Sequence, residues 1–175
     1  MNELTFSRDT LDAVIFDLDG VICFTDKFHY QAWKKLADRL GIYFDETINN
    51  RLRGVSRMAS LDIILERSDK TYSLEEKEAF AEEKNETYRE LLKTMTPADL
   101  SDEVRDTLAA LRDRGYRLAI GSSSKNTKFI LQRIGLADFF DAIADGTDIT
   151  HSKPDPEVFL TAAQKLWISP ERCAV

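Results

Sequence analysis

The chain has 175 residues, of which 43% are hydrophobic and 31% charged, a composition typical of a globular protein with one substantial core. Its formal charge of −7 argues against nonspecific nucleic-acid binding, which depends on clustered Lys and Arg. No apolar run approaches the ~20 residues of a membrane helix, and no secretory signal opens the sequence. We therefore expect a cytoplasmic monomer that binds neither nucleic acid nor membranes. Cys23 and Cys173 form no zinc or disulfide pattern, so both are expected to be buried as small apolar residues.

Short apolar runs predict the strands of a parallel sheet. The first run ends at Asp17, the second follows a helix predicted over 102–114 and leads into Ser122, and the third ends at Asp145. A strand covered on both faces fits the first run. Because helical patterns lie between and after the runs, the sequence predicts an α/β, Rossmann-like core with right-handed crossovers. The three runs are 13–16, 117–121 and 142–144.

A helical insertion interrupts this alternation. Between residues 25 and 95 the only periodicity is helical, and the segment is far longer than one crossover helix needs. We expect a helical cap domain at 25–95 and a core domain made of 1–24 and 96–175. Lys84 shares a stripe with apolar residues, which leaves two readings: a lysine that snorkels to solvent, or an ammonium turned inward toward a substrate. His29, taken alone, is a helix-face residue beside Trp33.

Polar residues follow the predicted strands, where ligands bind in open α/β sheets. Asp17 and Asp19 follow the first strand, Ser122 the second and Asp145 the third, and Lys153 lies in the short loop after Asp145. A carboxylate, a hydroxyl and an ammonium around one crevice suit phosphoryl transfer, because a carboxylate that attacks a phosphate needs positive charge nearby. Each residue alone has a structural reading: Ser122 as a turn residue or helix cap, and Lys153 in an exposed turn.

In combination these residues resemble the haloacid dehalogenase superfamily. Asp17-Leu18-Asp19-Gly20-Val21 is similar to its first motif, Ser122 to its second and Lys153-Pro154 to its third. The resemblance implies that Asp17 carries the phosphoryl group as an aspartyl phosphate and that Asp19 is the general acid/base. It also implies a Mg²⁺ cofactor with Asp17 and the backbone carbonyl of Asp19 as ligands, and Ser122 and Lys153 as catalytic residues.

In the predicted cap, Arg53-Gly54-Val55-Ser56-Arg57, followed by Ser60-Leu61, is similar to the substrate loop of the β-phosphoglucomutase family, and Lys84-Asn85 match a later helix of that family's cap. This implies a magnesium-dependent isomerase that interconverts β-D-glucose 1-phosphate and D-glucose 6-phosphate through β-glucose 1,6-bisphosphate, with a small-molecule sugar phosphate as its only partner. Arg57 would hold the distal phosphate and Lys84 the sugar, which favours the inward reading, and His29 would link cap closure to Asp19. The substrate-binding residues implied are Thr25, His29, Trp33, Arg53, Gly54, Val55, Ser56, Arg57, Ser60, Lys84, Ser123, Ser124, Lys125 and Asn126.

The resemblance also implies an acidic pair that completes the metal site, just beyond the position of Val175. We expect the sequence to be a truncated form of a longer protein, and the alternative is a chain of natural length with weak metal binding and little catalysis. Two further functions stay open. One is a sugar-phosphate phosphatase with the same nucleophile, and the other is a non-catalytic sugar-phosphate-binding protein.

Overall fold

The computed structural model describes residues 10–53 and 55–175, which fall into two compact units. The first unit contains the described residues up to Phe24 together with Met95–Val175, and the second contains Thr25–Thr94. These divisions lie within one residue of the predicted domain boundaries. That the units act as catalytic core and cap remains a prediction.

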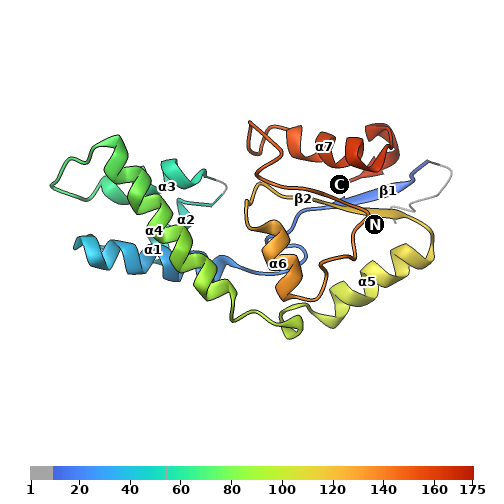
Figure 1. Cartoon of the computed structure of the whole chain (residues 1–175), viewed down its shortest axis with the longest axis horizontal. Helices are drawn as coiled ribbons and strands as arrows, with labels where there is room; N and C mark the ends of the chain where they lie inside the picture. The colour runs from blue at the N-terminus through green and yellow to red at the C-terminus, as the bar shows by residue number, and fades with distance from the viewer. Residues whose placement is uncertain (1–9, 54) are drawn as a thin grey trace. The chain divides into compact units, whose positions relative to one another are not determined.

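The first unit is built on a parallel four-stranded sheet with the order β3-β2-β1-β4. Figure 1 labels its two central strands, β1 and β2. β1 pairs with β2 from Ala13↔Arg117 to Phe16↔Ile120, so the residues after both strands emerge at the same edge of the sheet. The predicted α/β fold and its three strands are confirmed. The strands are β1 (Ala13–Phe16), β2 (Arg117–Gly121), β3 (Ala142–Ala144) and β4 (Cys173–Ala174).

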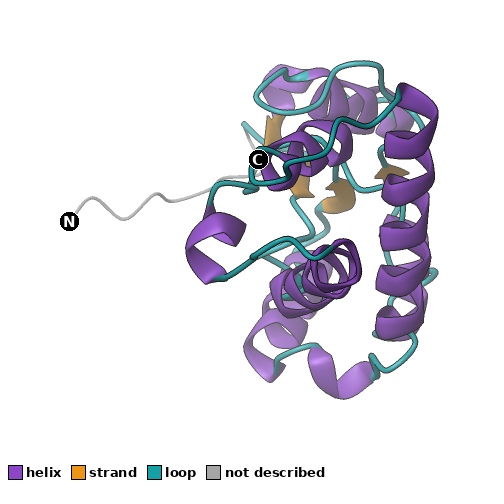
Figure 2. Ribbon diagram, turned by 90° about the vertical axis from the view of Figure 1, so that its left-hand side faces the viewer, coloured by secondary structure: helices purple, strands orange, loops and turns teal. Residues whose placement is uncertain are grey.

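Helix α7 covers one face of this sheet. Its buried residues Val158, Ala162 and Leu166 pack with Ala13 and Ile15 of β1 in one apolar cluster. The alternate residues of β1, Val14 and Phe16, are only half-buried, so the expectation of complete cover on both faces is wrong for the second face. Figure 2 shows the strands in orange beside the helices of this unit. Its helices are α5 (Asp102–Asp113), α6 (Thr127–Arg133) and α7 (Glu157–Leu166), with 3-10 turns η1 (Pro97–Asp99) and η2 (Pro170–Arg172).

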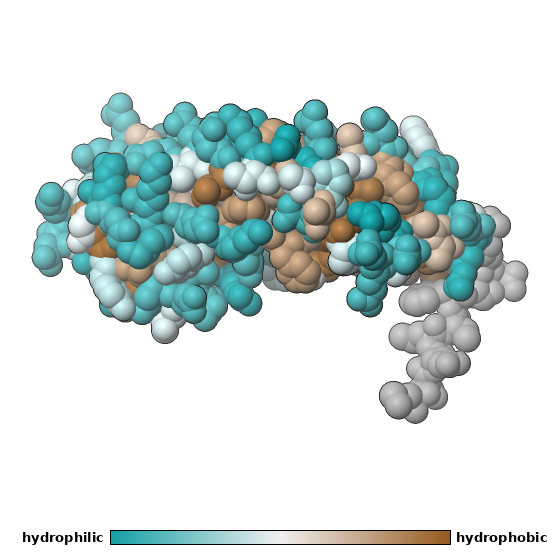
Figure 3. Space-filling view, turned by 90° about the horizontal axis from the view of Figure 1, so that it is seen from below, coloured by the Kyte–Doolittle hydropathy of each residue, from teal (hydrophilic) through white to brown (hydrophobic). Residues whose placement is uncertain are grey.

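The described part of the second unit contains helices and no strand, as the sequence predicted. Helix α4 begins with a capping box, in which the side chains of Ser73 and Glu76 each bind the other residue's backbone N–H. Trp33 and Leu36 of α1 are buried in its apolar cluster. In Figure 3, hydrophilic side chains cover much of this unit. The helices are α1 (Asp26–Leu40), α2 (Glu46–Asn50), α3 (Arg57–Leu65) and α4 (Leu74–Leu92). Over the described range, no helix is long and apolar enough to cross a membrane.

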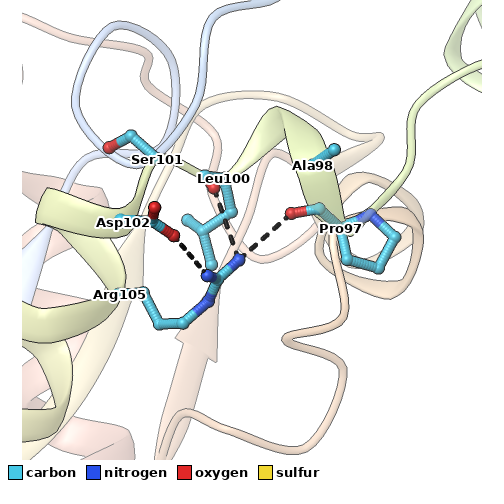
Figure 4. Close-up of a pocket in the computed structure, with 6 residues that line it drawn as sticks. All are labelled: Pro97, Ala98, Leu100, Ser101, Asp102 and Arg105. Atoms are coloured by element: carbon cyan, nitrogen blue, oxygen red, sulfur yellow. Dashed lines mark hydrogen bonds and ion pairs between the residues drawn. The ribbon is translucent and has the colours of Figure 1, made fainter.

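The chain re-enters the first unit through a segment that is held by two arginines. The guanidinium of Arg133 donates to the carbonyl of the fully buried Met95 from Nε at 3.1 Å and from Nη2 at 2.9 Å. Arg105 donates to the carbonyl of Pro97 at 3.3 Å and pairs with Asp102, as Figure 4 shows. The contacts of Arg105 border a cavity of about 430 Å³, and none of the predicted site residues lines it. Its lining residues are Pro97, Ala98, Leu100, Ser101, Asp102 and Arg105.

Candidate active site

Asp17 stands at the carboxyl end of β1, where the chain enters a tight turn. The carbonyl of the fully buried Leu18 accepts the backbone N–H groups of residues 21, 22 and 23, at 3.3, 2.9 and 3.2 Å. Gly20 has a φ of 81°, a conformation that suits glycine because a Cβ atom disfavours it. The N–H of Leu18 donates to Oδ1 of Asp17 at 2.7 Å. The turn therefore fixes the backbone on both sides of Leu18, from which the side chains of Asp17 and Asp19 project.

Lys153 lies beside Asp17, as the predicted crevice requires. Its Nζ is 2.8 Å from Oδ1 of Asp17 and 4.6 Å from the centre of the Phe159 ring. The side chains of Lys153 and Asp17 are 29% and 37% exposed, so a ligand can approach both. Phe159 in turn packs on Gly121 so closely that a Cβ at this position would come within 2.7 Å of the ring. Gly121 thus leaves room for the ring over which the ammonium lies.

The loop after β2 carries the predicted serines in a compact, hydrogen-bonded turn. Ser122 is 2% exposed, its N–H donates to the carbonyl of Ala144, and its hydroxyl accepts the N–H of Ser124 at 3.2 Å. In the described part of the structure the hydroxyl of Ser123 is buried without a hydrogen-bond partner. Ser124 is half-buried. Because β1 and β2 are paired in parallel, Ser122 follows its strand at the same sheet edge as Asp17.

Two other residues of this loop region differ in exposure. Lys125 is exposed, whereas Asn126 is buried immediately before helix α6. Gly146, in the loop after β3, lies so close to the carbonyl of Ser123 that no Cβ could be added there. The loops that follow β2 and β3 are therefore packed directly on each other.

Asp145 belongs to its own turn and not to the crevice that the sequence suggested. It is 2% exposed, and its Oδ1 accepts the N–H and the hydroxyl of Thr147 at 2.8 and 2.6 Å. Its Oδ2 lies 3.5 Å from Nζ of Lys128. These contacts support a structural role in the loop after β3.

Lys84 in the second unit points inward, so the snorkelling reading is wrong. It is 4% exposed, and its Nζ lies 2.9 Å from Nδ1 of His29 and 4.7 Å from the centres of the Trp33 and Tyr88 rings. Helical periodicity put Lys84 on the apolar stripe but could not say where its ammonium ends. The aromatic faces explain how the charge is accommodated, since a ring quadrupole attracts a cation.

His29 is linked to the start of the second unit through Tyr88. The two rings stack with centroids 4.0 Å apart, and the hydroxyl of Tyr88 donates to the fully buried Thr25 at 3.1 Å. Burial, followed by the charges of Lys84 and Arg57, lowers the pKa of His29 from 6.5 to about 3, so the imidazole is neutral at physiological pH. Tyr88 is not among the predicted site residues, although its spacing of four residues from Lys84 on one helix places the two side chains side by side.

The predicted substrate loop ends at Arg57, the first residue of helix α3, and both of its arginines form ion pairs. Arg57 donates from Nη2 to Oδ1 of Asn85 at 3.0 Å, and Arg53 lies 3.1 Å from Asp26. Ser56 caps α3 by accepting the N–H of residue 59. The loop's other predicted residues are Val55, which is exposed, Ser60, which is 3% exposed, and Gly54, which lies outside the described residues.

The two cysteines differ in burial. Cys23 is 1% exposed, and burial, with a smaller effect of Asp19, raises the pKa of its thiol to about 12. Cys173 is only half-buried in the edge strand β4, so the expectation that both are buried is wrong for this residue. Among the described residues, no group of three or more His, Cys, Asp or Glu side chains could hold a metal ion.

Comparison with known proteins identifies the family. The family model described as haloacid dehalogenase-like hydrolase matches residues 11–175. The chain belongs to this family. Asp17, Ser122 and Lys153, which carry the motif resemblance in the sequence, all lie within the matched residues. The structural resemblance extends to a crystal structure of β-phosphoglucomutase from Clostridium difficile, with 42% identity and a TM-score of 0.84 over 93% of this chain and 74% of that one.

Curated relatives of the chain carry different activities in their names. The β-phosphoglucomutase of Bacillus subtilis is 42% identical over 94% of this chain and 74% of its own length. The phosphorylated carbohydrates phosphatase of Thermotoga maritima is 31% identical over 94% of this chain and 75% of its own. A fructose-1-phosphate phosphatase of Escherichia coli is 32% identical over 93% and 84%. The relatives of this chain therefore include proteins named as a mutase and proteins named as phosphatases.

Proposed function

We propose that the chain is an isomerase that interconverts β-D-glucose 1-phosphate and D-glucose 6-phosphate through β-glucose 1,6-bisphosphate. The observation that carries this proposal is the 42% identity with a β-phosphoglucomutase across 94% of the chain. The pairing of Asp17 with Lys153 at 2.8 Å supports it, because a nucleophilic carboxylate needs a cation beside it when it meets a phosphate. We further propose a cytoplasmic monomer.

In the proposed reaction, an oxygen of Asp17 attacks the phosphorus of the bisphosphate. The bond between phosphorus and the sugar oxygen breaks, and that oxygen takes a proton from Asp19. In the other half-reaction, a sugar hydroxyl gives its proton to Asp19 while its oxygen attacks the aspartyl phosphate and frees the Asp17 carboxylate. Lys153 and the hydroxyl of Ser122 would bind the oxygens of the transferring phosphoryl group and offset its charge.

The donor set beside the nucleophile fits Mg²⁺, a hard cation that accepts one or two protein oxygens together with water and phosphate oxygens. We propose that the carboxylate of Asp17 and the backbone carbonyl of Asp19 hold it. Both belong to the turn that the buried Leu18 fixes. The ion, when bound, would supply positive charge against the repulsion between carboxylate and phosphate.

The second unit would supply the groups that recognise the sugar phosphate. We propose that Arg57 binds the distal phosphate, since a guanidinium suits a phosphate and Arg57 is the first residue of α3, at a helix end where the helix dipole also favours an anion. Lys84 would contact the sugar, and His29 would link cap closure to Asp19. The further substrate-binding residues proposed are Thr25, Trp33, Arg53, Gly54, Val55, Ser56, Ser60, Ser123, Ser124, Lys125 and Asn126.

A sugar-phosphate phosphatase is the second candidate, because two phosphatases with sugar-phosphate names are 31% and 32% identical to the chain. The two candidates share the aspartyl phosphate and differ in what accepts its phosphoryl group. In a mutase the acceptor is a sugar hydroxyl, and in a phosphatase it is water. The products therefore separate them.

The test follows β-glucose 1-phosphate by phosphorus NMR, with Mg²⁺ and a catalytic amount of the bisphosphate. We expect glucose 6-phosphate to accumulate without matching free phosphate, and Asp17→Asn to abolish the conversion. Stoichiometric phosphate release would refute the mutase and support the phosphatase. Stabilisation by the sugar phosphate without turnover would support the non-catalytic binding protein.

The role of Arg57 is tested separately. We expect Arg57→Ala to reduce isomerase activity far more than it reduces phosphoryl transfer from acetyl phosphate to Asp17. The reason is that acetyl phosphate has no distal phosphate for Arg57 to hold. An equal loss in both reactions would contradict the distal-phosphate role.

A further inference from the structure

The guanidinium of Arg57 is held by two neighbours on helix α4. Nη2 of Arg57 donates to Oδ1 of Asn85 at 3.0 Å, and Nη1 lies 3.7 Å from Oε2 of Glu82. The amide of Asn85 also donates from Nδ2 to Oε1 of Glu82 at 3.4 Å. The three side chains therefore form a closed triangle in which one neutral acceptor and one carboxylate share the guanidinium.

The two neighbours differ in charge and in exposure. The Glu82 side chain is 62% exposed and that of Arg57 32%, and their 3.7 Å separation makes this a loose ion pair. Such a pair contributes little and is exchanged easily for a better anion. The hydrogen bond from Arg57 to Asn85 is shorter and involves no opposing charge. A phosphate that binds Arg57 would compete with Glu82 but has no electrostatic reason to displace Asn85.

Helix α4 also supplies the inward-pointing Lys84, the residue before Asn85. One turn of this helix thus carries Lys84 and contacts Arg57 through Asn85, and these are two of the cations assigned to substrate recognition. The backbone of α4 positions Lys84 directly, and the side-chain amide of Asn85 on the same helix positions Arg57.

We propose that Asn85 is a positioning residue for Arg57 and that Glu82 is an internal competitor that the distal phosphate must displace from the guanidinium. This inference rests on the proposed function, in which Arg57 binds that phosphate. It makes Glu82 a determinant of affinity: the enzyme binds its sugar phosphate less tightly than the same site would without the carboxylate.

The first test compares two charge-neutralising variants on the same helix. Glu82→Gln is expected to lower KM for β-glucose 1-phosphate about two- to five-fold, the range of an exposed ion pair, with the main change in KM and not in kcat. The matched control is Glu83→Gln, because Glu83 pairs with Arg39 at 2.6 Å and not with Arg57. It removes the same charge one residue away and should leave KM unchanged. Equal shifts in both variants would show a general field effect and overturn the competitor role.

Salt gives a second readout of the competition. The advantage of Glu82→Gln over wild type should shrink at about 0.5 M salt, where interactions of exposed charges are screened. An advantage that persists undiminished would contradict an ionic competition.

The second test concerns Asn85. Asn85→Ala should raise KM for the sugar phosphate about ten-fold through loss of one hydrogen bond to a charged group. The rate of Asp17 phosphorylation by acetyl phosphate should stay the same, because that reaction does not use Arg57. Asn85→Asp keeps an acceptor but adds a carboxylate that competes with the phosphate for Arg57, so its KM should also stay above wild type. Equal losses with both phosphate donors would show a merely structural residue.

Direct binding separates this inference from the proposed function. We expect calorimetric titration with glucose 6-phosphate to show the tightest binding for Glu82→Gln, weaker binding for wild type and the weakest for Asn85→Ala. This measurement requires no turnover. If the three affinities follow this order but the wild-type protein does not isomerise the sugar phosphate, the mutase assignment fails and the positioning role stands. If it isomerises with no such order, the positioning role fails alone. If it neither binds nor isomerises, both are refuted.

Discussion

Replacing Lys84 with Met tests whether the buried ammonium in the second unit serves activity and not stability. The side chain is 4% exposed, and removing an ammonium from water costs several kcal/mol. Its contacts offset much of this cost: about 1.5–3 kcal/mol for the hydrogen bond to His29 and about 0.5–2 kcal/mol for each aromatic face. Met keeps the apolar contacts and needs no charge compensation, but it leaves Nδ1 of His29 without this donor, at about 1–3 kcal/mol.

These terms nearly cancel, so Lys84→Met should leave the free energy of unfolding within about 1 kcal/mol of wild type or raise it. Activity toward the sugar phosphate should fall by about 100-fold or more, because the group assigned to the sugar is gone. Urea unfolding followed by circular dichroism measures the first quantity and the isomerase assay the second. Lys35→Met, on the exposed side of α1, is the control and should change neither appreciably. A loss of stability above about 3 kcal/mol would refute the reasoning, because the ammonium would then be a net structural tie.

Three further predictions concern other contacts. His29, whose pKa is lowered from 6.5 to about 3, should stay neutral in an NMR titration down to about pH 4. Between pH 6.5 and 3 the unfolded chain therefore binds a proton at His29 that the folded state does not. As the pH falls through this range, the free energy of unfolding should fall by at most about 1.4 kcal/mol per pH unit more in wild type than in His29→Gln. Gly121→Ala should cost about 1–3 kcal/mol in urea unfolding by crowding Phe159, and Phe159→Leu in the same chain should recover part of it, whereas no recovery would place the clash elsewhere. Lys153→Met should slow phosphorylation of Asp17 about 100-fold without unfolding the protein, and an unchanged rate would exclude Lys153 from the transfer.

The sheet was the most predictable part of the molecule. Strands 13–16, 117–121 and 142–144 appear with the predicted bounds, because short apolar runs that end in polar residues leave few other ways to bury their side chains. The same reasoning anticipated Asp17 and Ser122 at one sheet edge, since parallel pairing alone brings them there.

Side-chain partners were less predictable, because periodicity gives a face of a helix and not the end of a long side chain. Lys84 lay on a correctly identified stripe, yet its inward direction depends on the rings of Trp33 and Tyr88, one of which is on another helix. Asp145 had the position of a site residue, but the hydroxyl of Thr147, two residues later, takes its carboxylate. Asn85 came from the family resemblance only as a matching residue, and its hydrogen bond to Arg57 across 28 positions has no local signature.

The carbonyl of Leu18 has a mechanical consequence for the two aspartates that flank it. Three backbone N–H groups converge on this one oxygen, and the side chain of Leu18 is fully buried. The backbone between Asp17 and Asp19 is therefore held rigidly. If Asp19 exchanges protons first with one sugar oxygen and then with another, rotation about its own side-chain bonds must move its carboxyl group between them. The Cα atoms of Asp17 and Asp19 would keep a constant spacing throughout the cycle.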